Sequence, residues 1–463
     1  MNTIVAEIIK IIKKSEDAIS REEQIWHYIV AKMAQYVGTA FEAIDEELAK
    51  AYSKKDYRVE RRDSRTIQGI FGAVTIRRRR MQAPDGKGMH PLDRELGIVP
   101  YQRYTPYFQH CVAQIAAKSV YRSTAMALTL LTPVTISHQE VGSLIKKVGE
   151  QYAKWEDAQA CAEPEDEAVL KTPEVLYIEG DGVIIRGQKQ KKIELHRFQI
   201  AEGVKVNGKR RELTGTYCFA GFNRSKTMNQ VKQYLEKNYD LSKTIVISNS
   251  DGGAGYSESV FTDITEGCKR HEHFRDRYHV NKKIKERLNF TEKALVNKLH
   301  RCLWDYDREG VSVVLDTVES VAEGKEQETQ VSQLRKYLER NWAYLRPIEQ
   351  RGGIDGYKKG IDTCESNHRL YTYRMKKQGR RWGKTGGEAM LKIITGLRNK
   401  NLARALTEQD KRFNKKQSRR FNGAVRMALK KTAFVEHVGI KHGRIVNYSP
   451  TSSAIGHLAK AFA

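Results

Sequence analysis

Two aspartates in this 463-residue sequence stand where a short apolar run gives way to glycines. Asp251 follows the β-branched run at residues 244–247, and Asp181 lies between two glycines in "YIEGDGV". A short apolar run predicts a buried parallel strand, and ligands collect at the carboxyl ends of such strands because the loops there leave a crevice. An Asx or glycine turn is the alternative explanation of Asp251, since Asp before Gly-Gly is common in turns. Glu179 has the same strand parity as Asp181, so spacing alone does not separate these two carboxylates.

A third carboxylate on a later helix would complete a cation site with these aspartates. Glu365, in "DTCESNHRLYTYRMKKQGRRW", is our candidate, and it is followed by basic side chains that could hold phosphate: His368, Arg369, Arg374, Lys376, Arg380 and Arg381. Mg²⁺ prefers carboxylate oxygens in near-octahedral geometry and keeps several waters. Two such ions, about 3.5–4 Å apart, activate the attacking oxygen and stabilise the leaving oxygen of an in-line displacement. We therefore expect Asp181, Asp251 and Glu365 to act as metal ligands and catalytic residues, without a covalent enzyme intermediate.

The charge of the chain is strongly positive and unevenly distributed. The net charge is +26, and residues 366–463 hold 23 lysines and arginines against four acidic residues. A field of this kind fits a polyanion, most simply nucleic acid, through phosphate neutralisation and counterion release. An anionic membrane surface would also fit, but no amphipathic helix with a broad apolar face is evident in that region.

Composition excludes several other classes of protein. The six cysteines are scattered without a CxxC pair, which suits a reduced, cytoplasmic protein without a zinc ribbon. No uncharged stretch of eighteen apolar residues is present, so we expect no membrane partner. The opening "MNTIVAEIIKIIKKSEDAI" predicts an amphipathic helix and not a signal peptide, and residues 1–53 as a whole predict two helices.

Residues 54–100 predict a basic β-hairpin. The segment "YRVERRDSRTIQGIFGAVTIRRRRM" alternates β-rich runs around Gly69 and Gly72 and ends in four consecutive arginines. Such a hairpin could lie on a DNA backbone. It could equally be a solvated edge, because charges on edge strands discourage aggregation.

Residues 101–155 contain a predicted helix-turn-helix. A short helix at 123–131 is followed by a break at 132–135, and Ser137 with Glu140 forms an S-x-x-E capping box for a second helix. One face of the second helix is apolar: Val141, Leu144, Ile145, Val148 and Tyr152. The other face is polar and basic, as expected of a helix that enters the major groove: His138, Gln139, Ser143, Lys146 and Lys147. An ordinary helical hairpin is the alternative.

The remaining sequence predicts a linker, a core, an insertion and a basic tail. Residues 156–173 are acidic and contain two prolines, which predicts a linker. From residue 174 three β runs are followed by a helix at 227–239, the Asp251 strand, a helix at 257–264 and a strand at 271–277. This is the element order of the ribonuclease H-like fold. We expect the core to occupy 174–283 and 356–400, with an all-α insertion at 284–355 between these parts. In the basic region 401–463 the predicted phosphate contacts are Lys411, Arg412, Lys415 and Lys416.

These segments together resemble a known family. The order "YIEGDGV", "VISNSDGGAGY", "HFRDRYHVNKKIKE", "CESNHR" and "GRRWGKTGGEAM", with "YRSTAMALTLLTPVTISHQEVGSLIKKVGE" upstream, resembles bacterial insertion-sequence DDE transposases of the ISLre-two family. The resemblance covers nearly the whole chain, and the core is more distantly similar to Mutator-like transposases. It implies an α/β ribonuclease H-like catalytic core with an all-α insertion, preceded by a mainly helical DNA-binding region with a helix-turn-helix. It also implies cutting at the element's ends and strand transfer into target DNA.

The resemblance assigns roles to individual residues. It places the DDE triad on Asp181, Asp251 and Glu365, with two Mg²⁺ or Mn²⁺ ions. Asp276 and His279 match the D-x-x-H signature of Mutator-like enzymes, which implies that His279 organises the site or the scissile strand.

The third acid has two possible substitutes, because the interval from the second aspartate is long: Glu388 and Asp362. The resemblance further implies a homodimer or larger synaptic oligomer in the bacterial cytoplasm, associated with the nucleoid. Its partners would be double-stranded DNA of the transposon ends and of the target. A domesticated repressor that only binds DNA, and a ribonuclease H-like nuclease that cuts without joining, are the alternatives.

Three patterns could be mistaken for other sites. "GRRWGKTGG" has one residue too few for a Walker phosphate loop and no buried strand before it, so we expect no nucleotide cofactor. Trp382 in this segment is expected to pack in the interior and not to stack on a base. Four possible zinc ligands lie close in sequence but without paired doublets, and we expect solvated histidines beside the active site instead: Cys268, His271, His273 and His279.

Overall fold

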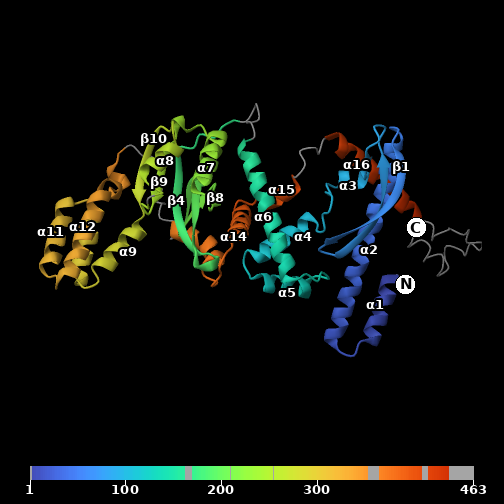
Figure 1. The fold of residues 1–463 in the computed structure, drawn as a ribbon, viewed down its shortest axis with the longest axis horizontal. Coiled ribbons are helices and arrows are strands. Elements are labelled where there is room, and N and C mark those ends of the chain that lie inside the picture. Colours follow the sequence, from blue (N-terminus) through green and yellow to red (C-terminus); the bar gives the residue numbers. More distant parts are fainter. Residues whose placement is uncertain are drawn as a thin grey trace, which may run out of the picture. The chain divides into compact units, whose positions relative to one another are not determined.

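The computed structural model describes residues 3–161, 169–208, 210–253, 255–352, 364–408 and 415–436. The chain forms two compact units (Figure 1). Unit 1 comprises Met1–Thr105, Thr132–Val134 and Asp410–Ala463, and unit 2 comprises Pro106–Leu131 and Thr135–Gln409. The first and last described helices of the chain therefore belong to the same unit.

Unit 1 combines a long helix, a β-hairpin and the last described helix of the chain. Its elements are α1 (Thr3–Lys14), α2 (Ala18–Ser53), β1 (Arg58–Gly69), β2 (Gly72–Gln82), β3 (Gly88–Met89), α3 (Pro91–Glu95) and α16 (Lys415–Glu436). The two predicted N-terminal helices and the predicted hairpin are confirmed. Asp17 caps α2 by accepting hydrogen bonds from the backbone N–H groups of Ile19 and Ser20. Ala424 of α16 packs with Leu48 and Val74 in one core cluster, which the basic sequence of the C-terminal region did not predict.

Unit 2 begins with the helices that the sequence predicted as a helix-turn-helix. They are α5 (Tyr121–Leu131) and α6 (His138–Cys161), and they are preceded by α4 (Pro106–Ala116), which the sequence did not predict. Ser137 Oγ accepts a hydrogen bond from the backbone N–H of Glu140 (3.1 Å), which is the capping half of the predicted motif. The predicted apolar stripe of α6 is buried over its whole length: Val141, Leu144, Ile145, Val148 and Tyr152.

Helix α6 continues past the boundary predicted for it and packs on the later helices α14 (Lys384–Arg398) and α15 (Leu402–Thr407). A side chain at Gly149 would collide with Ala389 of α14, so glycine permits the close crossing of the two helices. The prediction of a linker over 156–173 is wrong for residues 156–161. Glu156 is buried and forms an ion pair with Lys392 of α14, so the end of α6 belongs to the packed interior.

A five-stranded sheet forms the centre of unit 2. Its strands are β4 (Val175–Arg186), β5 (Lys192–Ala201), β8 (Tyr217–Gly221), β9 (Ile245–Ser250) and β10 (Arg270–Arg275), in the order β10-β9-β4-β5-β8. β4 is parallel to β9 and β9 to β10, whereas β5 is antiparallel to both of its neighbours. The three predicted β runs are instead five strands, because β6 (Gly203–Asn207) and β7 (Arg210–Thr214) form a separate hairpin between β5 and β8.

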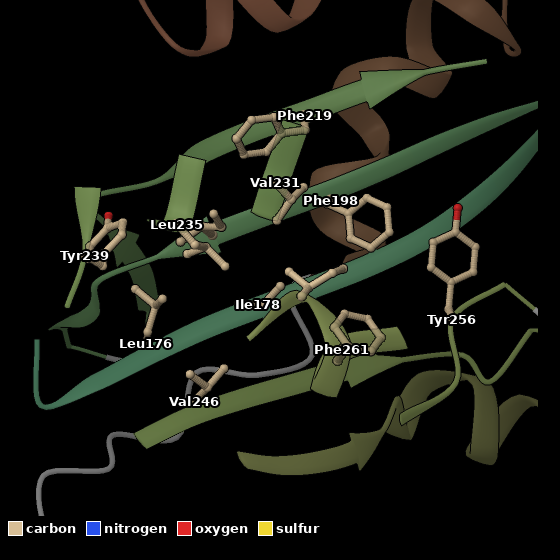
Figure 2. Packing of buried hydrophobic residues seen from close by; sticks show 12 residues of the cluster. Leu176, Ile178, Phe198, Phe219, Val231, Leu235, Tyr239, Val246, Tyr256 and Phe261 are labelled. Carbon is tan, nitrogen blue, oxygen red and sulfur yellow. The ribbon is translucent and has the colours of Figure 1, made fainter. Parts of the chain in front are cut away.

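Helices cover both faces of the sheet. On one face α7 (Arg224–Asn238) and α8 (Glu258–Ile264) contribute side chains to a cluster that includes Ile178, Phe198 and Val246 (Figure 2). On the other face Val175, Tyr177, Ile245 and Ile247 pack with Ile348. The helix α13 (Cys364–Met375) packs against β4, and α14 packs against β8.

The segment predicted as an all-α insertion is helical, and its first helix starts slightly earlier than expected. It contains α9 (Arg277–Arg287), α10 (Lys293–Asp305), α11 (Arg308–Ser320) and α12 (Lys325–Leu345), which share one apolar core cluster. Three short 3₁₀ helices complete the unit: η1 (Gln188–Gln190), η2 (Leu241–Lys243) and η3 (Ile348–Gln350). Among the described helices, none combines the length and the apolar character that a membrane crossing requires.

Candidate active site

The pairing of β4 with β9 brings the two predicted aspartates to one place on the sheet. The parallel register runs from Val175 opposite Ile245 to Glu179 opposite Asn249, a constant offset of 70 positions. The same offset relates Asp181 to Asp251, two residues further on. β9 ends at Ser250 while β4 continues to Arg186, so Asp181 lies where β4 loses its parallel neighbour. Both carboxylates therefore lie at the carboxyl end of β9.

The glycines around Asp181 serve packing on the opposite face of the sheet. Successive strand residues alternate between faces, so Gly180 and Gly182 face away from the side that carries Asp181. A side chain at Gly180 would come within 2.8 Å of the Phe198 ring. At Gly182 it would approach the Tyr256 ring at 3.3 Å. Figure 2 shows Phe198 and Tyr256 in the hydrophobic cluster that α7 and α8 cover. The motif thus places a buried carboxylate between two close-packed positions.

Asp251 begins a tight turn, as the alternative explanation of its glycines predicted. Its Oδ1 accepts a hydrogen bond from the backbone N–H of Gly253 (2.8 Å). Gly252 has a left-handed backbone (φ 80°), and a side chain there would collide with the guanidinium of Arg275. Arg275 also donates to Ser250 Oγ (3.3 Å). The turn therefore fixes the backbone at Asp251 and places the buried Arg275 guanidinium against Gly252.

The predicted D-x-x-H pair lies beside the same strand end. The backbone N–H of Asp276 donates to the carbonyl oxygen of Ser250 (2.9 Å), and Asp276 Oδ1 caps α9 by accepting from Tyr278 N (2.8 Å). Asp276 Oδ2 lies 3.0 Å from His279 Nδ1. The hydrogen bond to Asp276 raises the pKa of His279, burial opposes this, and the charges of Asp181 and Asp251 raise it further. His279 therefore senses both aspartates electrostatically.

Tyr256, on the other face of the sheet, is also influenced by the charges of the two aspartates. Its hydroxyl is 2.8 Å from His196 Nδ1. Burial raises its pKa well above the usual value, and the negative charges of Asp181, Glu194 and Asp251 raise it further. Two groups on different elements, Tyr256 and His279, thus both experience Asp181 and Asp251 together. This supports the spatial proximity that the strand register predicts.

Buried polar groups continue the site on the face that carries Asp181. Arg197 of β5 is fully buried and lies opposite Asp181 in the antiparallel register. Asn249 is also buried, and neither atom of its amide has a hydrogen-bond partner within the described part of the chain. Native interiors rarely leave a buried amide unpaired, so the amide of Asn249, two residues before Asp251, fits a site made of oxygen ligands.

The third predicted carboxylate, Glu365, belongs to the first turn of α13, and its side chain lies outside the described residues. α13 packs against β4, and the charge of Arg197 influences the pKa of the buried Tyr371 on α13. The helix therefore covers the face that carries Asp181. Among the described residues no group of three or more His, Cys, Asp or Glu side chains is arranged to hold a metal ion.

The substitutes for the third acid lie elsewhere. Asp362 falls outside the described residues. Glu388 accepts a hydrogen bond from the backbone N–H of Phe222 (2.9 Å), directly after β8. β5 separates β8 from β4, and burial raises the pKa of Glu388. Its carboxylate is thus bound at the end of β8, on the opposite side of β5 from the strand β4 that carries Asp181.

Most of the predicted DNA-contacting side chains whose positions are described reach solvent. Those that are exposed are Gln139, Ser143, Lys146, Lys147, Arg369, Lys376 and Arg381. His138 and Arg380 are half-buried. The other predicted phosphate contacts lie outside the described side chains: Lys411, Arg412, Lys415 and Lys416. The polar face of α6 is therefore open to a ligand.

Arg374 is an exception, and its prediction as a phosphate contact is wrong. Its side chain is buried, its Nε donates to the carbonyl oxygen of Ala116 (2.7 Å), and its guanidinium lies over the rings of Tyr121 and Trp382. Burial lowers its pKa to about 10. Arg374 therefore links α13 to the end of α4 and the start of α5. The sequence did not indicate this role, because Arg374 lies among basic residues that are mostly exposed.

Trp382 is buried, as predicted, and its indole N–H donates to the carbonyl oxygen of Met375 (2.9 Å). The expectation of solvated histidines is wrong for His273, which is buried and has its pKa lowered to about 3, mainly by burial. Ser248 Oγ lies 2.7 Å from His271 Nε2 and 2.8 Å from His273 Nδ1. These histidines therefore form a hydrogen-bonded chain along β9 and β10.

Several residues of the site have no marker in the sequence. Arg197 and Asn249 belong to the site through strand register, and Arg275 and Tyr256 through the turn that follows Asp251. One sequence feature could have indicated them: the glycine after Asp251 predicts that another group lies close to the backbone there, but it does not identify that group.

Comparison with known proteins places the chain in a family. The profile of the Uncharacterised protein family (UPF0236) matches residues 18–412. The chain is 36% identical over 399 residues to the "UPF0236 protein in vanSb 3'region" of Streptococcus gallolyticus, covering 86% of each chain. It is 22% identical over 409 residues, 85% of this chain and 78% of the relative, to a UPF0236 protein of Caldanaerobacter subterraneus subsp. tengcongensis whose name joins eleven designations, from TTE0033 to TTE2212. The chain therefore belongs to the UPF0236 family.

Proposed function

We propose that this protein is a DNA transposase of an insertion sequence, with a ribonuclease H-like core that cuts and joins DNA by a DDE mechanism. The observation that carries the proposal is the register of β4 and β9, which relates Asp181 to Asp251 at the carboxyl end of β9. Parallel strands meet their ligands at that end. Two carboxylates on neighbouring strands of a strongly basic protein favour metal-dependent chemistry on phosphate.

The topology supports the proposed fold. The core has three strands, a helix, a strand, a helix and a strand, interrupted only by the β6–β7 hairpin. The first strand of this series, β4, lies beside β9, as a ribonuclease H-like sheet requires. The insertion α9–α12 follows β10, and α13 returns the chain to the face of β4.

In this proposal Asp181, Asp251 and Glu365 hold two Mg²⁺ or Mn²⁺ ions. Bound there, the ions would activate the attacking oxygen and stabilise the leaving oxygen of the phosphodiester. Asp181 is placed on a strand and not on a loop, which fixes its carboxylate. The Arg275 guanidinium lies against the Asp251 turn at Gly252, where it would restrain movement of the turn. His279, held by Asp276, is positioned to donate a hydrogen bond to a phosphate oxygen of the scissile strand.

DNA recognition is assigned to the polar face of α6. Gln139, Ser143, Lys146 and Lys147 are exposed on one side of the helix, while its opposite side packs in the interior. A helix of this kind can enter the major groove. Transposition joins two ends, so we propose a homodimer or larger synaptic assembly on double-stranded DNA.

The names of the relatives are consistent with a mobile element. Besides the protein with eleven designations, others from the same organism carry four and two designations each. Such names are expected where one protein sequence is encoded at several places in a genome. Insertion sequences multiply in this way, whereas a repressor kept for one regulatory task does not.

The proposal is tested by cleavage and strand-transfer assays with purified protein, Mg²⁺ and duplexes that carry the ends of the element, uncut for cleavage and pre-cut for strand transfer. The wild type should join these ends to a target plasmid, and Asp251→Asn should neither cut nor join while still binding the ends. Asp263→Asn, at an exposed position on α8, is the matched control and should retain activity. Cutting without joining by the wild type would favour a nuclease, and binding without either reaction would favour a DNA-binding repressor.

A further inference from the structure

The arginines of the β1–β2 hairpin separate into two groups according to the face of the hairpin on which they lie. One face is turned to the interior of unit 1, where Asp93 forms ion pairs with Arg65 (3.0 Å) and Arg78 (2.8 Å). Arg65 also donates to the carbonyl oxygens of Val99 and Gln102. These two arginines therefore have partners within the fold.

On the other face, the strand residues at the middle of the hairpin are exposed and are polar or basic. In the antiparallel register Ser64 lies opposite Arg77 and Thr66 opposite Thr75, with Arg62 two residues before Ser64 on the same face. All five side chains are exposed: Arg62, Ser64, Thr66, Thr75 and Arg77. We name this set the outer hairpin face.

No carboxylate of the described residues forms an ion pair with the two arginines of the outer hairpin face, although the charge of Arg62 lowers the pKa of Asp45 against the larger effect of burial, which raises it. Arg62 and Arg77 are diagonal neighbours, about 7–8 Å apart between Cα atoms by strand geometry. Arg79 lies opposite Arg62 but forms an ion pair with the buried Asp45 (2.9 Å). Neither Arg62 nor Arg77 has an ion pair within the described part of unit 1. Glu42, which lies nearby, accepts a hydrogen bond from the backbone N–H of Arg77 (2.9 Å) and not from its guanidinium.

We propose that the outer hairpin face binds the phosphate backbone of duplex DNA. Arginines on neighbouring positions of one face repel each other unless an anion lies between them, and phosphate accepts their paired N–H groups. Serine and threonine hydroxyls beside them add the hydrogen bonds that commonly fix a protein on the DNA backbone. A two-stranded ribbon also fits the major groove. The inference rests on the proposed function and adds a second DNA contact to that of α6.

The composition of the outer hairpin face favours duplex DNA over the other polyanions. Its five residues include no aromatic ring, and binding of single strands depends on such rings for base stacking. They include no large apolar side chain that could enter a membrane surface. The hydrogen bond between Thr66 Oγ1 and Thr75 Oγ1 (2.9 Å) joins the two strands at the middle of the face. The face therefore presents a preformed polar surface.

The test is the salt dependence of binding of the full chain to a mixed-sequence DNA duplex, measured by fluorescence anisotropy. Two lost phosphate contacts should lower the slope of log Kobs against log [salt] by about 1.8 in Arg62→Ala/Arg77→Ala. Lys13→Ala/Lys14→Ala removes two exposed cations from α1 of the same unit and should change the slope by less than half as much. Arg62→Lys/Arg77→Lys keeps both charges and should restore the slope.

Equal losses in the hairpin variant and the α1 variant, or no loss in either, would overturn the inference. If the double alanine variant does not fold, each single variant should lower the slope by about 0.9, and an unchanged slope in both would count against the proposal. The outcome is separable from the proposed function. If the wild type cuts and joins DNA while the hairpin variants bind it normally, only this inference is refuted. If the wild type neither cuts nor joins DNA, the proposed function is refuted.

Discussion

Asp276 and His279 face each other across the first turn of α9, with 3.0 Å between Asp276 Oδ2 and His279 Nδ1. The pair links the helical insertion to the strand end that carries Asp251, because the backbone of Asp276 is hydrogen-bonded to Ser250. Its charge state therefore matters both for stability and for the candidate site.

We predict that His279 stabilises the fold more at acidic than at alkaline pH. Its pKa in the folded protein is raised, mainly by Asp276, so the folded state holds the proton more tightly than the unfolded state. The resulting stability is fully present below the unfolded pKa of about 6.5 and is lost as the pH rises through the raised folded value. The free energy of unfolding of the wild type should exceed that of His279→Gln by more at pH 6 than at pH 9. A difference that grows with pH would contradict the ion pair.

Gly252 should be essential for activity for a steric reason. Gly252→Ala adds a methyl group where the Arg275 guanidinium lies, so either Arg275 or the Asp251 turn must move. Gly267 has a similar left-handed backbone (φ 81°) with nothing within 4 Å of an added side chain, so Gly267→Ala measures the backbone strain alone. Both variants should lose about 1 kcal/mol or more of stability. Only Gly252→Ala should lose strand transfer as well, and equal activity in the two variants would refute the role given to Arg275.

The buried ion pair between Glu156 and Lys392 should hold α6 on the core. Both side chains are almost fully buried, and Gln230 donates to the same carboxylate. Lys392→Met leaves a buried carboxylate without its partner and should lower the free energy of unfolding by about 3–5 kcal/mol. The double variant Glu156→Leu/Lys392→Met removes both charges and should recover most of this loss. If urea unfolding shows the two variants equally unstable, the pair itself is not what matters.

Much of the fold could be predicted because local sequence determines it. Strand and helix order in the core followed from apolar periodicity, and the buried face of α6 followed from its spacing. Asp181 and Asp251 could be selected because each lies shortly after an apolar run and next to a glycine. Their relation across the sheet could be expected only from the resemblance to a known fold, since strand pairing is not written in either segment.

Other features depend on long-range packing, which no local pattern shows. Arg374 has the same basic neighbours as the exposed Arg369 and Lys376, but it is buried between α4, α5 and α13. Glu156 looked like part of an acidic linker because its partner, Lys392, is 236 residues away. In the hairpin the arginine run gave no sign of which side chains face Asp93 and which face solvent. Register and burial alone distinguish them.

The central claim is that Asp181 and Asp251 jointly bind divalent cations, and it is tested most directly by Mn²⁺ binding. Electron paramagnetic resonance titration of Mn²⁺ should be carried out on the full chain bound to a pre-cut end duplex, with Asp181→Asn, Asp251→Asn and Glu365→Gln beside the wild type. We expect the wild type to bind about two ions per chain and each of the three variants to lose at least one. Unchanged Mn²⁺ binding in both aspartate variants would contradict the account.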